Sequence, residues 1–504
     1  MLAWTIYSSF LGAALIFLLP RESKSLVRAL ALLTALTGLA LGLTATFQYK
    51  FGLVTITNVS WVPSLGIRYH LAADGISLTL LLLTGIAAVA GILFSWNIEH
   101  RVQEFFALYL VLIGGVYGVF LSFDLFLLFV FYELAIIPKY FLIAIWGSSR
   151  KEYGAMKLAL YSFVGSAMVL IGLLAAYAWT ATHQAGVPAG IDLPGFGLID
   201  LARFPFPKEF QAWAFPLVFI GFAILAGLWP FHTWAPTGHV AAPTAASMLL
   251  AGVVMKLGAY GALRVAMTLF PVGLAMWRDT LAVLAAIGIV YGGAVALVQK
   301  DFKFVIGYSS VSHMGFVLLG LMTLTSIGLS GAVLQMFSHG IIAGLLFAVV
   351  GRMVYDRTHT RELGQLEGMG LNKALPFAAF TFVIAGVASM GLPGFSGFVA
   401  ELQVLIGAWR TFPVLAIITA AGILVGIAYT LRAIQRSFFG PSASAAPENP
   451  PTNLEPISWP ERIAAGLLML TTLAIGLYPR LLLDLIRAGF DTPLMVNLWK
   501  GVGP

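Results

Sequence analysis

Three ionisable side chains lie inside long apolar runs of the sequence. Glu133 lies in LFLLFVFYELAIIPKYFLIAIWG, Lys256 in SMLLAGVVMKLGAYGALRV and Glu401 in GLPGFSGFVAELQVL. A charged side chain at the centre of a bilayer costs at least about 2.5 to 3.5 kcal/mol on insertion scales, so each position needs a reason. One interpretation is that each charge only pairs with a neighbouring helix, although small and hydroxyl residues do this at lower cost. The alternative, which we favour, is a proton path, because buried carboxyl and ammonium groups can exchange protons near neutral pH.

Two histidines lie in similar apolar surroundings. His313 lies in GYSSVSHMGFVLLG and His339 in QMFSHGIIAGLLF. A neutral imidazole can pass a proton between partners, and the nearby serines could hold a chain of water. Each histidine is equally compatible with a packed, hydrogen-bonded core residue, and each serine with ordinary helix contacts.

Two segments interrupt the helical pattern close to these charges. The segment LWPFHTWAPTGHVAAP, residues 228 to 243, contains three prolines together with His232 and His239. The segment LPGFSGF places Pro393 and two glycines shortly before Glu401. A simple proline kink would explain either break alone. Two breaks, each near a buried charge or a histidine, favour discontinuous membrane helices around a hydrated interior.

The composition requires a bilayer around these residues. The chain has 504 residues, 60% hydrophobic and only 10% charged, against about a quarter charged in globular domains. Counting apolar runs of about 20 residues predicts an all-α integral membrane protein with about fourteen transmembrane helices. The runs are 2–20, 27–46, 76–96, 105–121, 125–146, 158–180, 212–229, 242–263, 280–298, 304–324, 327–350, 374–406 with a break, 412–430 and 463–478.

The basic residues indicate the orientation of these helices. Sixteen Lys and Arg residues fall in loops on one side and ten on the other, while Lys139 and Lys256 lie inside spans. The richer side is expected to be cytoplasmic, with both termini on the periplasmic side of a bacterial inner membrane. We therefore attribute the net charge of +7 to topology and expect no nucleic acid partner. Residues 436 to 461 form a polar, proline-rich connector.

Several chemistries have no residues to support them. The chain has no cysteine, which excludes disulfides and thiolate-bound metals or clusters. It also lacks a P-loop, a GxGxxG element after a strand and an HExxH motif. We expect no cofactor or metal in this chain, and a partner must supply the energy for transport.

The motifs around these residues resemble the antiporter-like subunits of respiratory complex I, the proton-pumping NADH-quinone oxidoreductase. The resemblance rests on FYELAIIPKYFLIAIWG, WPFHTWAPTGHVAAPTAASMLLAGVVMKLGAYGALR, KFVIGYSSVSHMGF and LPGFSGFVAE, and it extends from about residue 70 to residue 436. It implies two inverted five-helix repeats in which helices 7 and 12 are broken. The implied division is 1–75, then a first half 76–265, a second half 266–436 and a C-terminal part 437–504.

The same resemblance implies roles for the buried residues. Glu133 would be the glutamate of helix 5 and Lys256 the central lysine of helix 8, while Glu401 would end the relay toward the outer compartment. His313 and His339 would take part in the hydrated axis between Lys256 and Glu401. Subunits L and N usually have lysine at the position of Glu401, whereas subunit M has glutamate, so this position resembles subunit M.

One position departs from the family. A lysine is expected on helix 7, five residues before the proline of WPFH, but this chain has Leu225 there. Glu133 therefore lacks the implied partner. Lys139 is a candidate substitute, because Pro138 can bend the helix and a lysine stem is long. The alternative is that Lys139 extends to the membrane interface.

The sequence thus predicts a proton-translocating membrane subunit of a NADH-quinone oxidoreductase. Glu133, Lys256 and Glu401 would transfer protons, with His313, His339, His232 and Lys139 as possible relay groups. The resemblance implies that NADH, FMN, iron-sulfur clusters and quinone reside in other subunits, and that L-like and N-like subunits are neighbours in the bilayer. The alternatives are a cation/proton antiporter subunit of the Mrp type, a membrane subunit of a related hydrogenase or ferredoxin-linked complex, and a scaffold that no longer pumps.

Overall fold

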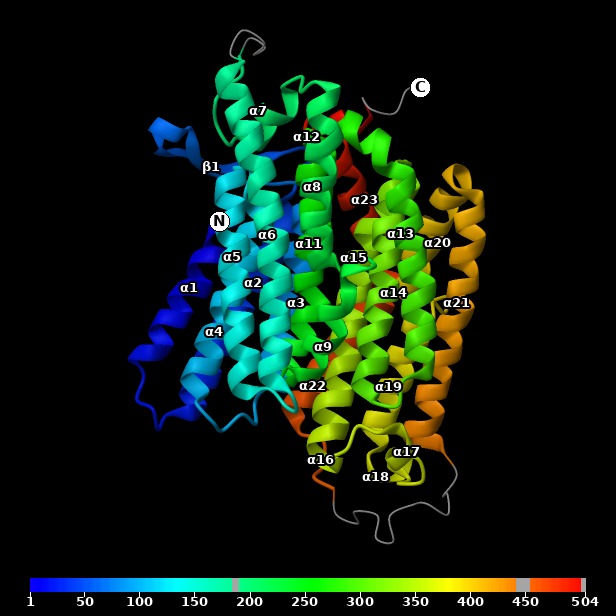
Figure 1. Ribbon diagram of the computed structural model, residues 1–504. Coiled ribbons are helices and arrows are strands. Elements are labelled where there is room, and N and C mark those ends of the chain that lie inside the picture. The colour runs from blue at the N-terminus through cyan, green and yellow to red at the C-terminus, as the bar shows by residue number, and fades with distance from the viewer. Residues whose placement is uncertain (184–189, 441–453, 500–504) are drawn as a thin grey trace.

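The computed structural model describes residues 1–183, 190–440 and 454–499 and is a bundle of long, nearly parallel helices (Figure 1). Within these ranges, twelve helical segments are long and apolar enough to cross a membrane, and two shorter apolar helices, Ala3–Leu18 and Pro376–Ser389, accompany them. The predicted all-α membrane bundle of about fourteen spans is therefore confirmed. Of the predicted connector, residues 441–453 lie outside the described residues.

The first half of the bundle is made of simple helices followed by a broken one. They are α1 (Ala3–Leu18), α2 (Lys24–Gln48), α3 (Gly75–Phe94), α4 (Val102–Leu121), α5 (Leu125–Trp146), α6 (Lys151–Thr182), α7 (Leu198–Arg203), α8 (Lys208–Ala226), η3 (Phe231–Thr233) and α9 (Trp234–Ala241). Helices α3 and α5 each begin with an aspartate N-cap. The carboxylate of Asp74 accepts hydrogen bonds from the backbone N–H groups of Ile76 and Ser77, and the carboxylate of Asp124 accepts one from the backbone N–H of Leu127. These caps place the helix starts just after polar residues.

The next helix changes its hydrogen-bond pattern twice. It consists of α10 (Thr244–Leu249), the π-helical segment η4 (Leu250–Val254), α11 (Met255–Gly261), a second π-helical segment η5 (Ala262–Ala266) and α12 (Met267–Leu269). Every residue in the most apolar 18-residue stretch of this helix is buried. Its end is held by Arg264, which forms a fully buried ion pair with Asp74 at the start of α3. Such π segments occur frequently at functional sites.

The second half repeats the sequence of long helices and a break. It contains α13 (Pro271–Val298), α14 (Phe302–Met322), α15 (Ser326–Ala348), the π-helical segment η6 (Val349–Tyr355), α16 (Asp356–Thr358), α17 (Leu363–Leu366), α18 (Leu371–Ala374), α19 (Pro376–Ser389), α20 (Ser396–Thr411), α21 (Pro413–Ile434), the π-helical segment η7 (Gln435–Phe439), α22 (Trp459–Leu477) and α23 (Arg480–Phe490). Helix α15 is buried from Gly328 to its end, whereas most of α21 is not buried. Lys256 on α11 thus lies in the interior, whereas Glu401 lies on α20, which is only partly buried.

Both predicted breaks are present. Helix α8 ends at Gly227, whose φ of 83° is the left-handed conformation that glycine adopts readily, and α9 begins after a short 3-10 turn. Between α19 and α20, Gly391 and Gly394 have φ values of 72° and 102° and flank Pro393. Each break therefore has the glycines and proline that a sharp local turn needs.

A β-hairpin was not predicted. Strand β1 (Val54–Val62) pairs antiparallel with β2 (Ile67–Ala73) between α2 and α3. The segment is rich in valine, isoleucine and threonine, which favour strands, but it is too short and polar to register as a membrane span. The start of α1 and helix α23 lie toward the same end of the bundle as this hairpin in Figure 1. We call the opposite end, formed by the loop before α2 and by α16, α17 and α18, the basic face.

Candidate functional site

Four of the predicted residues meet in the centre of the bundle. Lys256 on α11 is fully buried, and its Nζ lies 2.8 Å from Nδ1 of His339 on α15. Nζ also donates to the carbonyl oxygen of Ala251 in the preceding π-helical segment. The side chain is therefore directed at α15 and not at the lipid.

The contacts continue from His339 to Glu401. The rings of His339 and His313 lie almost parallel, with 5.3 Å between their centres and 27° between their planes. Nδ1 of His313, on α14, is 3.0 Å from Oε1 of Glu401 on α20. Lys256, His339, His313 and Glu401 thus form one continuous series, which we call the central row. It joins four helices, α11, α15, α14 and α20, of which only α14 and α15 are consecutive in the chain.

A small cavity lies beside the central row. It has a volume of about 10 Å³ and is lined by both histidines, Glu401, Ser389 and Gln335 among others. This is about the space that one water molecule needs. Nε2 of His339 has no hydrogen-bond partner among the described residues, so this nitrogen is available to a water in the cavity that His339 lines.

The turn before α20 lies close to the carboxylate of Glu401, the last member of the row. A Cβ atom on Gly391 would lie 2.9 Å from Oε2 of Glu401, so the turn before α20 approaches the carboxylate as closely as only glycine allows. Ser389, the last residue of α19, has its Oγ 3.1 Å from Nε2 of His313. The break thus supplies both the carboxylate and a hydroxyl partner.

Glu133 and Lys139, both on α5, do not join the central row. Lys139 on α5 is 1% exposed, so its side chain is enclosed by the protein. It interacts electrostatically with Glu133, but the two form no direct ion pair in the described part of the chain. Leu225 is buried on α8, and the backbone beside it packs against Gly258, two residues from Lys256. Leu225 thus packs beside the helix of Lys256 without offering a charged group to Glu133.

His232 lies apart from both groups. Its ring packs against Tyr291 at 5.2 Å and Tyr308 at 6.3 Å between ring centres. None of its described contacts is to Lys256, His313, His339 or Glu401.

Sequence reasoning missed several polar side chains around the row. Gln335 donates to Oε1 of Glu401 at 3.3 Å and also lies 3.4 Å from Nδ1 of His313. His239, noticed only as part of the first break, is fully buried and interacts electrostatically with Lys256. A neutral amide in an apolar run was the only available signal for Gln335, and it is weaker than a charge. Across the described ranges, no three His, Cys, Asp or Glu side chains are grouped as a metal site would require.

Comparison with known proteins decides the family. The family described as NADH:quinone oxidoreductase/Mrp antiporter, TM matches residues 122–427. The chain belongs to this family. A NADH-quinone oxidoreductase subunit M from Rhodobacter capsulatus is 37% identical over 435 residues, covering 86% of this chain and 83% of that protein. The chain is accordingly a multi-pass membrane protein.

Solved structures agree on the fold of this family member. A chain of respiratory complex I from Thermus thermophilus with bound NADH has a TM-score of 0.86 and 30% identity, covering 98% of this chain and all of the other. A chain of the Mrp complex from Dietzia sp. DQ12-45-1b has a TM-score of 0.84 at 22% identity, covering 99% and 98%. The second likeness concerns the fold alone.

Proposed function

We propose that the chain is a proton-translocating membrane subunit of a NADH-quinone oxidoreductase, and that protons move along the central row. The observation that supports this most strongly is the continuous contact from Lys256 through His339 and His313 to Glu401. Each member can hold or release a proton. The pairs Lys256–His339 and His313–Glu401 are within hydrogen-bond distance, and the two stacked histidines line a cavity about the size of one water.

The energy would come from other subunits. Relatives named NADH-quinone oxidoreductase subunit M support a place for this chain inside an enzyme complex, and we propose that it has no redox site of its own. NADH, FMN, iron-sulfur clusters and quinone would then belong to neighbouring subunits. We further propose L-like and N-like subunits as membrane neighbours, a bacterial inner membrane location and a cytoplasmic basic face, with both termini on the periplasmic side.

In the first half we propose that Lys139 replaces the missing lysine as the partner of Glu133. Its complete burial supports this role, because a lysine without a function would be free to reach the interface. The functional division would follow 1–75, 76–265, 266–436 and 437–504, so that each central half contains one helix break. His232, which belongs to neither group, is the weakest of the proposed relay residues.

Proton pumping by the parent complex with Lys256→Ala tests this proposal. In vesicles, we expect the ratio of protons moved to donor oxidised to fall by the whole contribution of this chain, with the complex still assembled. The exposed Lys300 provides a matched control, since Lys300→Ala removes a charge of the same kind outside the bundle. An unchanged ratio in assembled Lys256→Ala complex would favour a structural scaffold instead.

The Mrp fold likeness supports one alternative, a cation/proton antiporter subunit. That function predicts proton movement that depends on Na⁺ and needs no electron donor. Pumping that requires donor oxidation and is indifferent to Na⁺ would exclude it. A hydrogenase or ferredoxin-linked parent complex would be recognised by its electron donor.

A further inference from the structure

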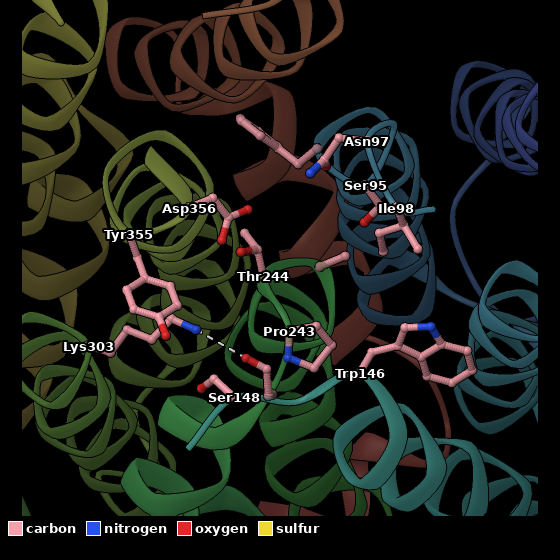
Figure 2. A pocket seen from close by; sticks show the side chains of 13 residues that line it. Ser95, Asn97, Ile98, Trp146, Ser148, Pro243, Thr244, Lys303, Tyr355 and Asp356 are labelled. Atoms are coloured by element: carbon pink, nitrogen blue, oxygen red, sulfur yellow. Dashed lines mark hydrogen bonds between the residues drawn. The ribbon is translucent and has the colours of Figure 1, made fainter. Parts of the chain in front are cut away.

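The helix that contains Lys256 is held differently at its two ends. Toward the basic face, Pro243 and Thr244 are only half-buried and line a cavity of about 190 Å³ (Figure 2). At the opposite end, residues 262–269 are all buried, and Arg264 pairs there with Asp74. Neither side chain of this ion pair has any exposed surface. The firmer attachment of the helix is therefore at the end remote from the cavity.

The backbone hydrogen bonds of this helix do not by themselves fix the direction of Lys256. The lysine lies in α11, between the π-helical segments η4 and η5. A π turn contains about one residue more than an α turn. If a π turn moved along the helix by one residue, the residue that it passed would rotate by about 100° around the helix axis. Nζ of Lys256 lies 2.8 Å from Nδ1 of His339, and such a rotation would break this contact.

The ion pair attaches the helix to the start of α3. The carboxylate of Asp74 accepts hydrogen bonds from the backbone N–H groups of Ile76 and Ser77, each at 3.0 Å, so its position is fixed by α3 itself. The guanidinium of Arg264 also lies over the ring of Phe123, 5.5 Å from the ring centre. In the most apolar stretch of α3, 94% of the residues are buried. Arg264 thus connects the end of the helix to a fixed point in the interior.

A tyrosine one turn after Lys256 makes a second attachment. The hydroxyl of Tyr260 donates to the carbonyl oxygen of Phe120 in the last turn of α4 at 3.0 Å, and it lies 3.3 Å from Oγ of Ser77 on α3. The rings of Tyr260 and Phe120 pack edge to face, with 5.1 Å between their centres. The part of the helix beyond Lys256 is therefore attached to both α3 and α4.

Stability alone is a weak explanation for the buried ion pair. Moving two charges out of water costs free energy, and apolar groups of similar volume are often at least as stabilising in the same place. The pair also leaves three buried atoms without a partner among the described residues, namely Oδ2 of Asp74 and Nε and Nη1 of Arg264. Each such atom carries a desolvation cost. The best-attested use of buried polar groups is to select one packing register.

We propose that Arg264 and Asp74, together with the hydroxyl of Tyr260, are positioning residues that keep Lys256 directed at His339. In the described part of the chain, none of the three forms a hydrogen bond or ion pair with a member of the central row, so they act through the helix. The ion pair fixes the helix beyond Lys256, which keeps the two π turns in place. The inference rests on the proposed proton transfer through Lys256 and adds the residues that orient this lysine.

A neutral replacement of the ion pair in the assembled parent complex tests the proposal. Asp74→Asn retains an N-cap for α3, and Arg264→Met retains an apolar stem, so the double variant leaves no unpaired buried charge. We expect this complex to oxidise its donor, and the protons moved per donor oxidised to fall by most of the contribution of this chain. A pair that only supports folding would instead lower the amount of assembled complex and leave this ratio unchanged.

Three single variants complete the experiment. Arg264→Lys keeps a cation beside Asp74 and should recover most of the pumping. Tyr260→Phe removes one hydrogen bond without changing any charge, so we expect the rate of pumping to fall about two- to tenfold. Arg203→Met, which removes an exposed arginine from α7, is the matched control and should pump normally.

Two results would overturn the proposal. One is an assembled Asp74→Asn/Arg264→Met complex with the proton-to-donor ratio of the unmodified complex. The other is a double variant that does not assemble, together with normal pumping by Tyr260→Phe. The proposed function fails separately, because normal pumping by Lys256→Ala would refute transfer through the lysine itself. Loss of pumping in Lys256→Ala with normal pumping in the double variant would contradict only the positioning role.

Discussion

The two halves of the bundle contain similar parts in different arrangements. In the second half, the helix break brings Glu401 to 3.0 Å from His313, and the polar series continues without interruption to Lys256. In the first half, the helix break brings no charged residue to Glu133, because Leu225 occupies the expected position. Glu133 and Lys139 are left as a separate pair. The comparison teaches that a broken helix creates a site only where it also presents an ionisable side chain.

Removing the carboxylate of the second half should have the largest effect. Glu401→Gln keeps the shape of the side chain but cannot release a proton, so the row loses its last member. We expect the protons moved per donor oxidised to fall by the full share of this chain, measured by pH change in vesicles. Glu362→Gln, an exposed position, is the matched control. Normal pumping by Glu401→Gln would show that the row ends elsewhere.

The first half should respond to the loss of either partner. If Lys139 serves Glu133, then Lys139→Ala and Glu133→Ala should lower pumping to a similar extent, and the double variant should be no worse than the single ones. Residues that act as one unit give such non-additive results. Intact pumping in Lys139→Ala together with abolished pumping in Glu133→Ala would refute the pairing.

Restoring the lysine on α8 should make the halves more alike. Leu225→Lys places a second ammonium near Glu133, and we expect it to rescue pumping in the Lys139→Ala background. The buried charge will cost about 2.5 to 3.5 kcal/mol if it remains unpaired, so assembly should be measured alongside activity. An assembled double variant as inactive as Lys139→Ala would indicate that Lys139 has a different role.

The smallest effect is expected from the amide beside the row. Gln335→Leu removes hydrogen bonds to Glu401 and His313 without removing a proton-accepting group. A hydrogen bond to a charged group contributes about 1.5 to 3 kcal/mol, so proton transfer should slow by a factor of about ten to about a hundred. Steady-state pumping rates would measure this. A loss as complete as that of Glu401→Gln would mean that Gln335 holds the row together.

Hydropathy was sufficient to predict most of the fold. The spans and both breaks follow from long apolar runs and from prolines and glycines within them, signals that act locally along the chain. The hairpin 54–73 was missed because its strands are short and lie outside any span. The sequence also could not place Lys139, since burial depends on what the neighbouring helices leave open.

The central row could be predicted only as a set of residues. Which nitrogen faces which oxygen depends on helix rotation, and the π-helical segments on either side of Lys256 change that rotation in a way no periodicity reveals. The proline-rich break suggested His232 and His239 equally, yet His232 packs against two tyrosines whereas His239 interacts with Lys256.

The most direct test of the account is the effect of His339→Ala on protons moved per donor oxidised. His339 is the only described residue that contacts Lys256 on one side and His313 on the other, so its loss interrupts the row while leaving Lys256 and Glu401 in place. We predict an assembled complex that oxidises its donor but lacks the proton contribution of this chain. An unchanged proton-to-electron ratio in that complex would contradict translocation through the central row.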